Sequence, residues 1–193
     1  MATITLASTS KFKSEILSRV GLKHTCKSSK NAEISSIKDP YEYVVDLAFN
    51  KAQSIKEDTT TDIIIGLDTI VLTNNKIIEK PKSLEEARNN IKESSNNISR
   101  VITGISIINT KTNKVVNTYQ ETIVHFKEIN KCDIDFYLEN EPDIMYASGF
   151  IIENIASNFI DKIEGSYYNI LGSPVEKIYE ILNTMNIYLK DIN

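Results

Sequence analysis

The sequence predicts a mixed α/β protein whose sheet is not purely parallel. Segments rich in Ile and Val alternate with segments of helical apolar spacing, which is the order of elements in an α/β chain. Two pairs of apolar segments are separated only by short polar turns, at 74–75 and at 110–113, and such hairpins require antiparallel neighbours. With 193 residues, the chain is long enough to bury a core of its own.

The first third of the chain predicts one strand and two helices. Residues 4–7 form a short apolar run, and Ser10 is an N-cap residue for a helix that ends at Gly21. Residues 23–39 are polar and predict irregular structure. Pro40 is typical of a first helical position, and the second helix has apolar residues at helical spacing: Val44, Leu47, Ala48 and Ala52.

The next segment, "DIIIGLDTIVLTNNKIIEKP" at 62–81, predicts a strand followed by a hairpin. Asn74 and Asn75 are the residue type that such a two-residue turn favours. Ser83 and Glu86 then have the spacing of a capping box, which predicts a helix over 84–94.

The last part predicts paired strands, two helices and two further short strands. "RVITGISIIN" at 100–109 and "KVVNTYQETIVHF" at 114–126 are joined by the turn "TKTN". We expect a helix over 132–139. "ASGFIIENIASNFIDKI" at 147–163 predicts two short strands, and Pro174 begins a final helix that runs to about Met185.

Composition excludes several classes of protein. The net charge is −4, and binders of nucleic acid or of anionic membranes need a basic face, so neither partner is expected. No segment approaches the length of an apolar membrane span, and no signal peptide is visible. Cys26 and Cys132 are isolated and lack metal-ligand spacing, which indicates reduced thiols. We therefore expect a cytoplasmic protein.

The junction between the first strand and the first helix is a candidate anion site. Ser8, Ser10, Lys11 and Lys13 lie where the free N–H groups of a helix N-terminus point toward solvent. Hydroxyls and ammonium groups there would bind a phosphate. The alternative is an ordinary capped helix with solvated lysines.

Three further segments carry candidate residues. In "GLDT", Asp68 follows the run Ile63–Ile65, and a carboxylate at the exit of a buried strand can hold a cation or activate water. In "EKP", Lys80 lies at the end of the hairpin. "EGSYYNILGSP" at 164–174 is either a tight turn with buried aromatic residues or a loop that shapes a pocket.

Taken together, these segments resemble the Maf family of nucleoside triphosphate pyrophosphatases. The resemblance rests on "LASTSKFKSEIL", Glu33, "YVVDLAFNKA", "IIGLDT", "EKPKSLEEAR", "TGISI", "ETIVHF" and "EGSYYNILGSP", in the family's order and close to its spacing. It implies one Maf-like domain over residues 1–193. It also implies a curved mixed sheet with flanking helices, in two lobes around a cleft, and cleavage of a triphosphate to a monophosphate and pyrophosphate.

The resemblance implies roles for individual residues. Ser8, Ser10 and Phe12 would contact the substrate. Lys13, Lys51 and Lys80 match the family's cationic phosphate contacts, and a triphosphate with close to four negative charges needs such cations. Glu33 and Asp68 match its acidic residues, and both are predicted ligands of a divalent cation, Mg²⁺ or else Mn²⁺. Asp68 either orients or deprotonates the attacking water, or holds the metal that does so.

The sequence also departs from the family. Many relatives have Ser-Pro-Arg-Arg at the first turn, where this chain has Ser10, Lys11, Phe12 and Lys13, and lysine lacks the planar fork of arginine. The branch acting on dTTP and UTP has lysine and glutamine where this chain has Tyr146 and Glu153. The branch acting on 7-methyl-GTP has an aromatic residue at Phe12 and a glutamate at Glu153.

These departures leave two base preferences open. Glu153 is matched to a guanine edge, and Phe12 could stack on a methylated guanine or else pack in the core with Ile16 and Val20. "GLDT" and "GSYYN", however, resemble the dTTP/UTP branch. The resemblance further implies a homodimer. The favoured function is that of a house-cleaning pyrophosphatase. The alternatives are a nucleotide-binding regulator of cell division with little catalysis, or an unrelated α/β protein.

Overall fold

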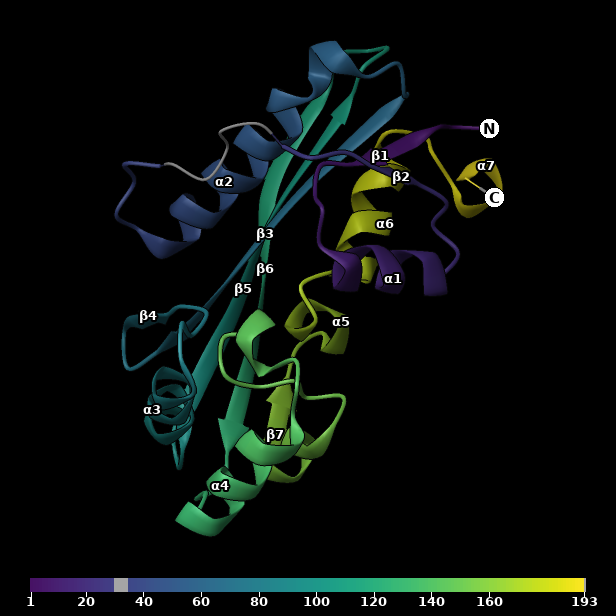
Figure 1. Cartoon of the computed structure of the whole chain (residues 1–193). Helices are drawn as coiled ribbons and strands as arrows, with labels where there is room; N and C mark the ends of the chain where they lie inside the picture. The colour runs from purple at the N-terminus through teal and green to yellow at the C-terminus, as the bar shows by residue number, and fades with distance from the viewer. Residues whose placement is uncertain (30–34, 193) are drawn as a thin grey trace. The chain divides into compact units, whose positions relative to one another are not determined.

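The computed structural model describes residues 1–29 and 35–192. In this part of the chain seven strands form one mixed sheet, in the order β2-β1-β3-β5-β6-β7, with β4 paired to β3 outside that path (Figure 1). The mixed α/β class predicted from the sequence is confirmed. The strands are β1 (Ile4–Leu6), β2 (Thr25–Cys26), β3 (Ile63–Thr73), β4 (Lys76–Ile78), β5 (Ile98–Asn109), β6 (Val115–Phe126) and β7 (Ile160–Glu164).

The sheet combines parallel and antiparallel pairs. β1 lies between β2 and β3 and is parallel to both, with Leu6 opposite Cys26 on one side and Ile65 on the other. β4 is antiparallel to β3, and β7 is antiparallel to β6. The short strand β2 falls in a segment that the sequence predicted to be irregular. Its two residues follow no periodic pattern and are ordered by pairing with β1.

The predicted hairpin is confirmed, but it changes the place of Asp68. Asn74 and Asn75 both have positive φ, 52° and 60°, as a two-residue turn requires. β3 runs on to Thr73, because Leu72 and Val71 pair with β4. Asp68 therefore lies in the middle of β3 and not at the exit of a strand, which corrects the expectation from the sequence.

The helices begin largely where the local sequence rules place them. α1 (Lys11–Arg19) has Ser10 as its N-cap residue, α2 (Pro40–Ser54) has Pro40 at its start, and α3 (Leu84–Ser94) has Ser83 as its N-cap residue. The Glu86 carboxylate accepts a hydrogen bond from the N–H of Lys82, one residue before the N-cap. The other helices are α4 (Lys131–Asn140), α5 (Tyr167–Ile170), α6 (Val175–Thr184) and α7 (Leu189–Ile192), with 3₁₀ turns at Lys56–Asp58, Ile144–Tyr146 and Ile155–Phe159.

The prediction of two short strands in 147–163 is wrong. Only β7 forms, and a 3₁₀ turn precedes it. Phe150 and Phe159 instead join Phe126 and Tyr137 in an aromatic cluster, with Phe126 and Phe150 stacked at 4.4 Å between ring centroids. The Tyr137 hydroxyl accepts a hydrogen bond from the N–H of Ile151, and burial raises the pKa of this tyrosine. The apolar residues of this segment therefore serve the cluster and not a strand ladder.

Two compact units divide the chain. The first contains residues 1–69, 102–121 and 166–193, and the second contains 70–101 and 122–165, so β3, β5 and β6 each contribute to both. The first unit has a large aliphatic core, built from β1, β3, β5, α1 and α6. The second contains the aromatic cluster. Two units agree with the expectation of two lobes; the expected cleft and the single domain over 1–193 stay predictions.

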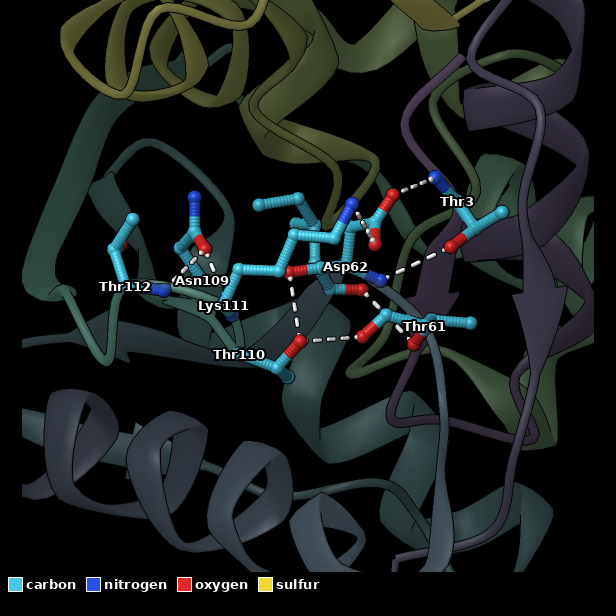
Figure 2. A network of polar contacts seen from close by, with 8 residues as sticks. Thr3, Thr61, Asp62, Asn109, Thr110, Lys111 and Thr112 are labelled. Carbon is cyan, nitrogen blue, oxygen red and sulfur yellow. Dashed lines mark hydrogen bonds and ion pairs between the residues drawn. The ribbon is translucent and has the colours of Figure 1, made fainter.

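The turn between β5 and β6 is tied to the start of β3 by a polar network (Figure 2). Asn109 Oδ1 accepts from the N–H groups of Lys111 and Thr112, at 3.1 and 3.0 Å. Lys111 forms an ion pair of 2.8 Å with Asp62, whose carboxylate also accepts from the N–H of Thr3. These bonds, the one from Lys111 foremost, lower the pKa of Asp62.

The structure bears on two features from which the sequence analysis inferred the cellular compartment, namely the cysteines and the helices. Cys26 and Cys132 are both free and exposed. None of the helices in the described ranges has the length and apolar character needed to cross a membrane.

Candidate functional site

Helix α2 lies directly on the sheet of the first unit because two strands carry glycine beneath it. A Cβ on Gly66 of β3 would overlap the carbonyl oxygen of Ala48, and would lie 3.0 Å from the Cβ of Ala52. A Cβ on Gly104 of β5 would overlap the carbonyl of Val44. No side chain fits at either position, so the two glycines set how close the helix backbone comes to β3 and β5.

This close approach brings Lys51 of α2 to Asp68 of β3. The Lys51 ammonium forms an ion pair and a hydrogen bond with Asp68 Oδ1. The side chains are only 12% and 16% exposed, so this pair is largely shielded from water. The sequence assigned both residues to the site, and the structure places them in contact.

Lys13 reaches the same stretch of β3 from helix α1. Its Nζ donates a hydrogen bond of 3.0 Å to the carbonyl oxygen of Leu67, the residue before Asp68. The Lys13 carbonyl accepts from Ser173 Oγ at 3.4 Å, and Gly172 faces the Lys13 side chain. Two lysines and a carboxylate, from three separate segments, thus converge on residues 67–68.

The hydroxyls at the start of α1 act as backbone caps. Ser8 Oγ accepts from the N–H of Ser10 at 3.1 Å, and Ser10 Oγ accepts from the N–H of Lys13 at 3.5 Å. The N-cap role predicted for Ser10 is therefore confirmed, whereas the alternative of solvated lysines does not hold for Lys13, whose Nζ bonds to Leu67. A phosphate contact by either hydroxyl stays a prediction.

A buried polar chain beside this site was not singled out from the sequence. Thr69 and Thr103 share a hydrogen bond of 3.0 Å between hydroxyls, and Thr103 Oγ1 lies 3.5 Å from the carbonyl oxygen of Asn169. Thr103 and Asn169 are fully buried. These residues lie in "GLDT", "TGISI" and "GSYYN". The family resemblance was partly based on these segments, but it assigned no role to these three side chains. They join β3, β5 and α5 behind Asp68 and Lys13.

The other residues singled out for the site differ in unit and in exposure. Lys80, Glu153 and Tyr146 belong to the second unit and are exposed, Tyr146 to 64%. Phe12 is 43% exposed, so it does not pack in the core as Ile16 does. Glu33 lies outside the described residues.

The site offers a divalent cation one carboxylate. Among the described residues, no three His, Cys, Asp or Glu side chains are grouped so that they could hold a metal ion. Mg²⁺ at nucleotide sites is commonly held by one or two carboxylates together with phosphate oxygens of the substrate. Asp68, paired with Lys51, therefore fits a metal that arrives with a phosphate ligand.

The arrangement has the parts that phosphoryl chemistry needs. Ammonium groups offset negative charge, and a carboxylate fixed beside them can orient water or accept its proton. Because Lys51 and Lys13 are already held in place, little side-chain freedom is lost when a polyphosphate binds.

Comparison with known proteins gives a family match over most of the chain. The family model described as "Maf-like protein" matches residues 3–185. A dTTP/UTP pyrophosphatase of Thermoanaerobacter sp. (strain X514) is 37% identical over 180 residues, which is 93% of this chain and 94% of that protein. A dTTP/UTP pyrophosphatase of Clostridioides difficile (strain 630) is 33% identical over 180 residues, covering 93% of each.

A solved structure is also similar. The crystal structure of protein VC0702 from Vibrio cholerae aligns with 97% of this chain and 99% of its own, at 12% sequence identity and a TM-score of 0.44.

Proposed function

Because this chain belongs to the family of Maf-like proteins, we propose that it hydrolyses a nucleoside triphosphate to the monophosphate and pyrophosphate. The observation that carries the proposal is that Lys13 and Lys51 contact neighbouring residues of β3: Lys13 bonds to the carbonyl of Leu67, and Lys51 pairs with Asp68. The pyrophosphatase names of relatives at 33–37% identity agree with the enzyme class predicted from the sequence. Nothing favours the alternative of a regulator without turnover.

We propose dTTP and UTP as the preferred substrates. Both relatives described above carry that name, and "GLDT" and "GSYYN" resemble the same branch. The exposed Glu153 is the residue that argues for guanine, because a carboxylate accepts from the two N–H donors of a guanine edge. A pyrimidine such as uracil offers only one N–H donor and is poorly matched to a carboxylate. We therefore expect Glu153 to reduce the preference for dTTP and UTP over guanine nucleotides.

The proposed reaction needs a water, a base and cations. The water oxygen forms a bond to one of the two phosphorus atoms of the α–β bridge, the bond from that phosphorus to the bridging oxygen breaks, and pyrophosphate separates from the monophosphate. Asp68 receives the proton of the water or orients it. Lys13 and Lys51, with Lys80, offset the charge that accumulates on the phosphate oxygens.

We propose Mg²⁺ as the cofactor, with Mn²⁺ as a substitute. Asp68 would hold it together with oxygens of the substrate, and Glu33 is the second predicted ligand. When bound, the metal would neutralise phosphate charge and polarise the attacked group.

We also propose a single catalytic domain over residues 1–193 that acts in the cytoplasm as a homodimer. The resemblance implies the domain and the dimer, and two free cysteines agree with a reducing compartment. Analytical ultracentrifugation tests the dimer.

The test is a panel of triphosphates assayed for pyrophosphate release with Mg²⁺. The panel holds dTTP, UTP, dCTP, CTP, GTP, 7-methyl-GTP, ATP and ITP. We expect dTTP and UTP to give the highest kcat/KM. Clear preference for a guanine nucleotide would overturn the pyrimidine assignment, and no pyrophosphate from any member would overturn the activity.

A further inference from the structure

A groove outside the candidate site lies between helix α2 and strand β6 in the first unit. It encloses about 470 Å³. Its walls carry the aromatic rings of Tyr41, Phe49 and Tyr119, with Ile37 at one side. Tyr119 is 46% exposed, and its ring lies 5.1 Å from that of Tyr41. So much aromatic surface at a groove is typical of a binding surface.

The charge of the groove is negative. Glu42 and Asp46, one turn apart on α2, line it, and no lysine, arginine or histidine is among the described residues that do so. Asp46 accepts a hydrogen bond from the neutral side chain of Asn50, at 3.2 Å. Carboxylates that line the same groove as tyrosine rings are suited to the ammonium or guanidinium group of a ligand.

The strand at the groove has an open edge. β5 flanks β6 on one side, and β7 pairs only with Ile123–Phe126. In the part of the chain that the structure describes, no strand pairs with Val115–Glu121 on the side away from β5. An extended peptide can add to such an edge through main-chain hydrogen bonds.

This edge lacks the usual protection against strand addition. Exposed edges normally carry lysine, proline or a bulge. "VVNTYQE" at 115–121 has none of these, and the bulge of β6 lies further on, between His125 and Phe126. Its one charged side chain, Glu121, accepts a hydrogen bond of 2.7 Å from the Tyr41 hydroxyl.

We propose that the groove between α2 and the open edge of β6 binds an extended, basic segment of a partner protein. The segment adds a strand to Val115–Glu121, and its lysine or arginine side chains lie against Tyr41 and Tyr119 and pair with Glu42 and Asp46. The edge selects an extended backbone, and the carboxylates select a cationic side chain over an acidic one.

The test uses fluorescence polarisation with three labelled octapeptides. One alternates valine and arginine, one alternates valine and glutamate, and one repeats the first sequence with alternate backbone nitrogens methylated. We expect the wild-type protein to bind the first peptide in the micromolar range, and the other two at least about tenfold more weakly. Equal binding of the methylated peptide would overturn strand addition, and equal binding of the glutamate peptide would overturn the preference for cations.

Variants locate the binding. Glu42→Gln with Asp46→Asn should weaken the arginine peptide by about tenfold or more, and Tyr119→Ala should weaken it by about threefold or more. The control, Glu57→Gln with Glu139→Gln, changes net charge equally at exposed positions that do not line the groove. Pyrophosphate release should be unchanged in all of them. If the control weakens binding as much as the first double variant, or if the edge binds a second copy that the peptide cannot displace, the proposal fails.

Discussion

Two of the lysines predicted to contact a triphosphate differ from the third in how the fold holds them. Lys13 and Lys51, in the first unit, are engaged with Leu67 and Asp68 of β3. Lys80, in the second unit, lies exposed after β4. If all three lysines contact phosphate as predicted, Lys13 and Lys51 are positioned before substrate binds, whereas Lys80 would lose side-chain freedom on binding. We expect the first group to affect both stability and turnover, and Lys80 to affect turnover alone.

Removing the carboxylate at the centre of the first group should have the largest effect. Asp68→Asn should lower kcat by about 10³-fold or more, because it removes the candidate base and metal ligand together. An amide still accepts a hydrogen bond from Lys51, so the protein should stay folded by circular dichroism. The matched control is Asp161→Asn, an exposed carboxylate of β7. Asp68→Asn with most of the wild-type turnover would remove Asp68 from the mechanism.

Separating α2 from β3 should disturb the first group without touching its charged atoms. Gly66→Ala puts a methyl group into the Ala48 carbonyl, so we expect a loss of about 3 kcal/mol and a fall in Tm of about 6–12 °C. Turnover should fall as well, because Lys51 shifts away from Asp68. Thermal unfolding and pyrophosphate release measure the two effects, with Ser157→Ala at an exposed position as control. An unchanged Tm would show that the helix can move without cost.

Alanine variants of the lysines compare the two groups directly. Lys13→Ala, Lys51→Ala and Lys80→Ala should each lower kcat/KM by about tenfold or more on every base, since phosphate is common to all. Lys51→Ala should also lower Tm, because it leaves the partly buried Asp68 without its ion pair. Lys80→Ala and the control Lys190→Ala should not. Loss on one nucleotide only would show that the lysine reads the base.

The exposed Glu153 sharpens the comparison for the base. Glu153→Gln should raise the ratio of dTTP to GTP turnover by about tenfold, because an amide both donates and accepts hydrogen bonds and so suits a pyrimidine edge better than a carboxylate does. A tenfold change lies within the free-energy cost of about 1–3 kcal/mol that is typical of one mispaired polar group. Competition between the two nucleotides in one reaction measures the ratio, and an unaltered ratio would exclude Glu153 from base recognition.

The smallest effect concerns Asp62, the residue directly before β3. Its pKa is lowered in the folded state, so its contribution to stability is present above the unfolded pKa and is lost as pH falls through the lower, folded pKa. Asp62→Asn should therefore lower Tm at pH 7 by about 2–4 °C, and the difference should vanish once the pH falls below the folded pKa of Asp62. A difference in Tm that is independent of pH would show that Lys111 and Thr3 do not stabilise the ionised form.

Local rules predicted most of the elements. Ser10, Pro40, Ser83 and the pair Asn74–Asn75 act within a few residues of themselves, so their sequence neighbours suffice to place caps and turns. They failed in 147–163, where Phe150 packs on the distant Phe126 of β6, and Phe159 packs on Phe150 and on Tyr137 of α4. α7 was also missed, because it is a short turn capped by Asp191 and bonded to Ala2 at the other end of the chain.

For the candidate site, too, the sequence predicted individual residues but not the long-range contacts between them. Asp68, Lys13 and Lys51 followed from the resemblance, but the contact between Lys51 and Asp68 depends on the packing of α2 on Gly66 and Gly104. The positions of these two glycines in the sequence do not indicate which helix packs on them. The support from Thr103 and Asn169 joins strands and helices far apart in the chain, which one sequence cannot reveal.

The most direct test of the central claim is to identify the products of dTTP hydrolysis by phosphorus NMR, with wild-type protein and Asp68→Asn side by side in Mg²⁺. If Lys13, Lys51 and Asp68 form the phosphate end of a nucleoside triphosphate pyrophosphatase, the wild type yields dTMP and pyrophosphate in equal amounts, and the variant leaves dTTP intact. Formation of dTDP and orthophosphate, or intact dTTP after long incubation with the wild type, would contradict the account.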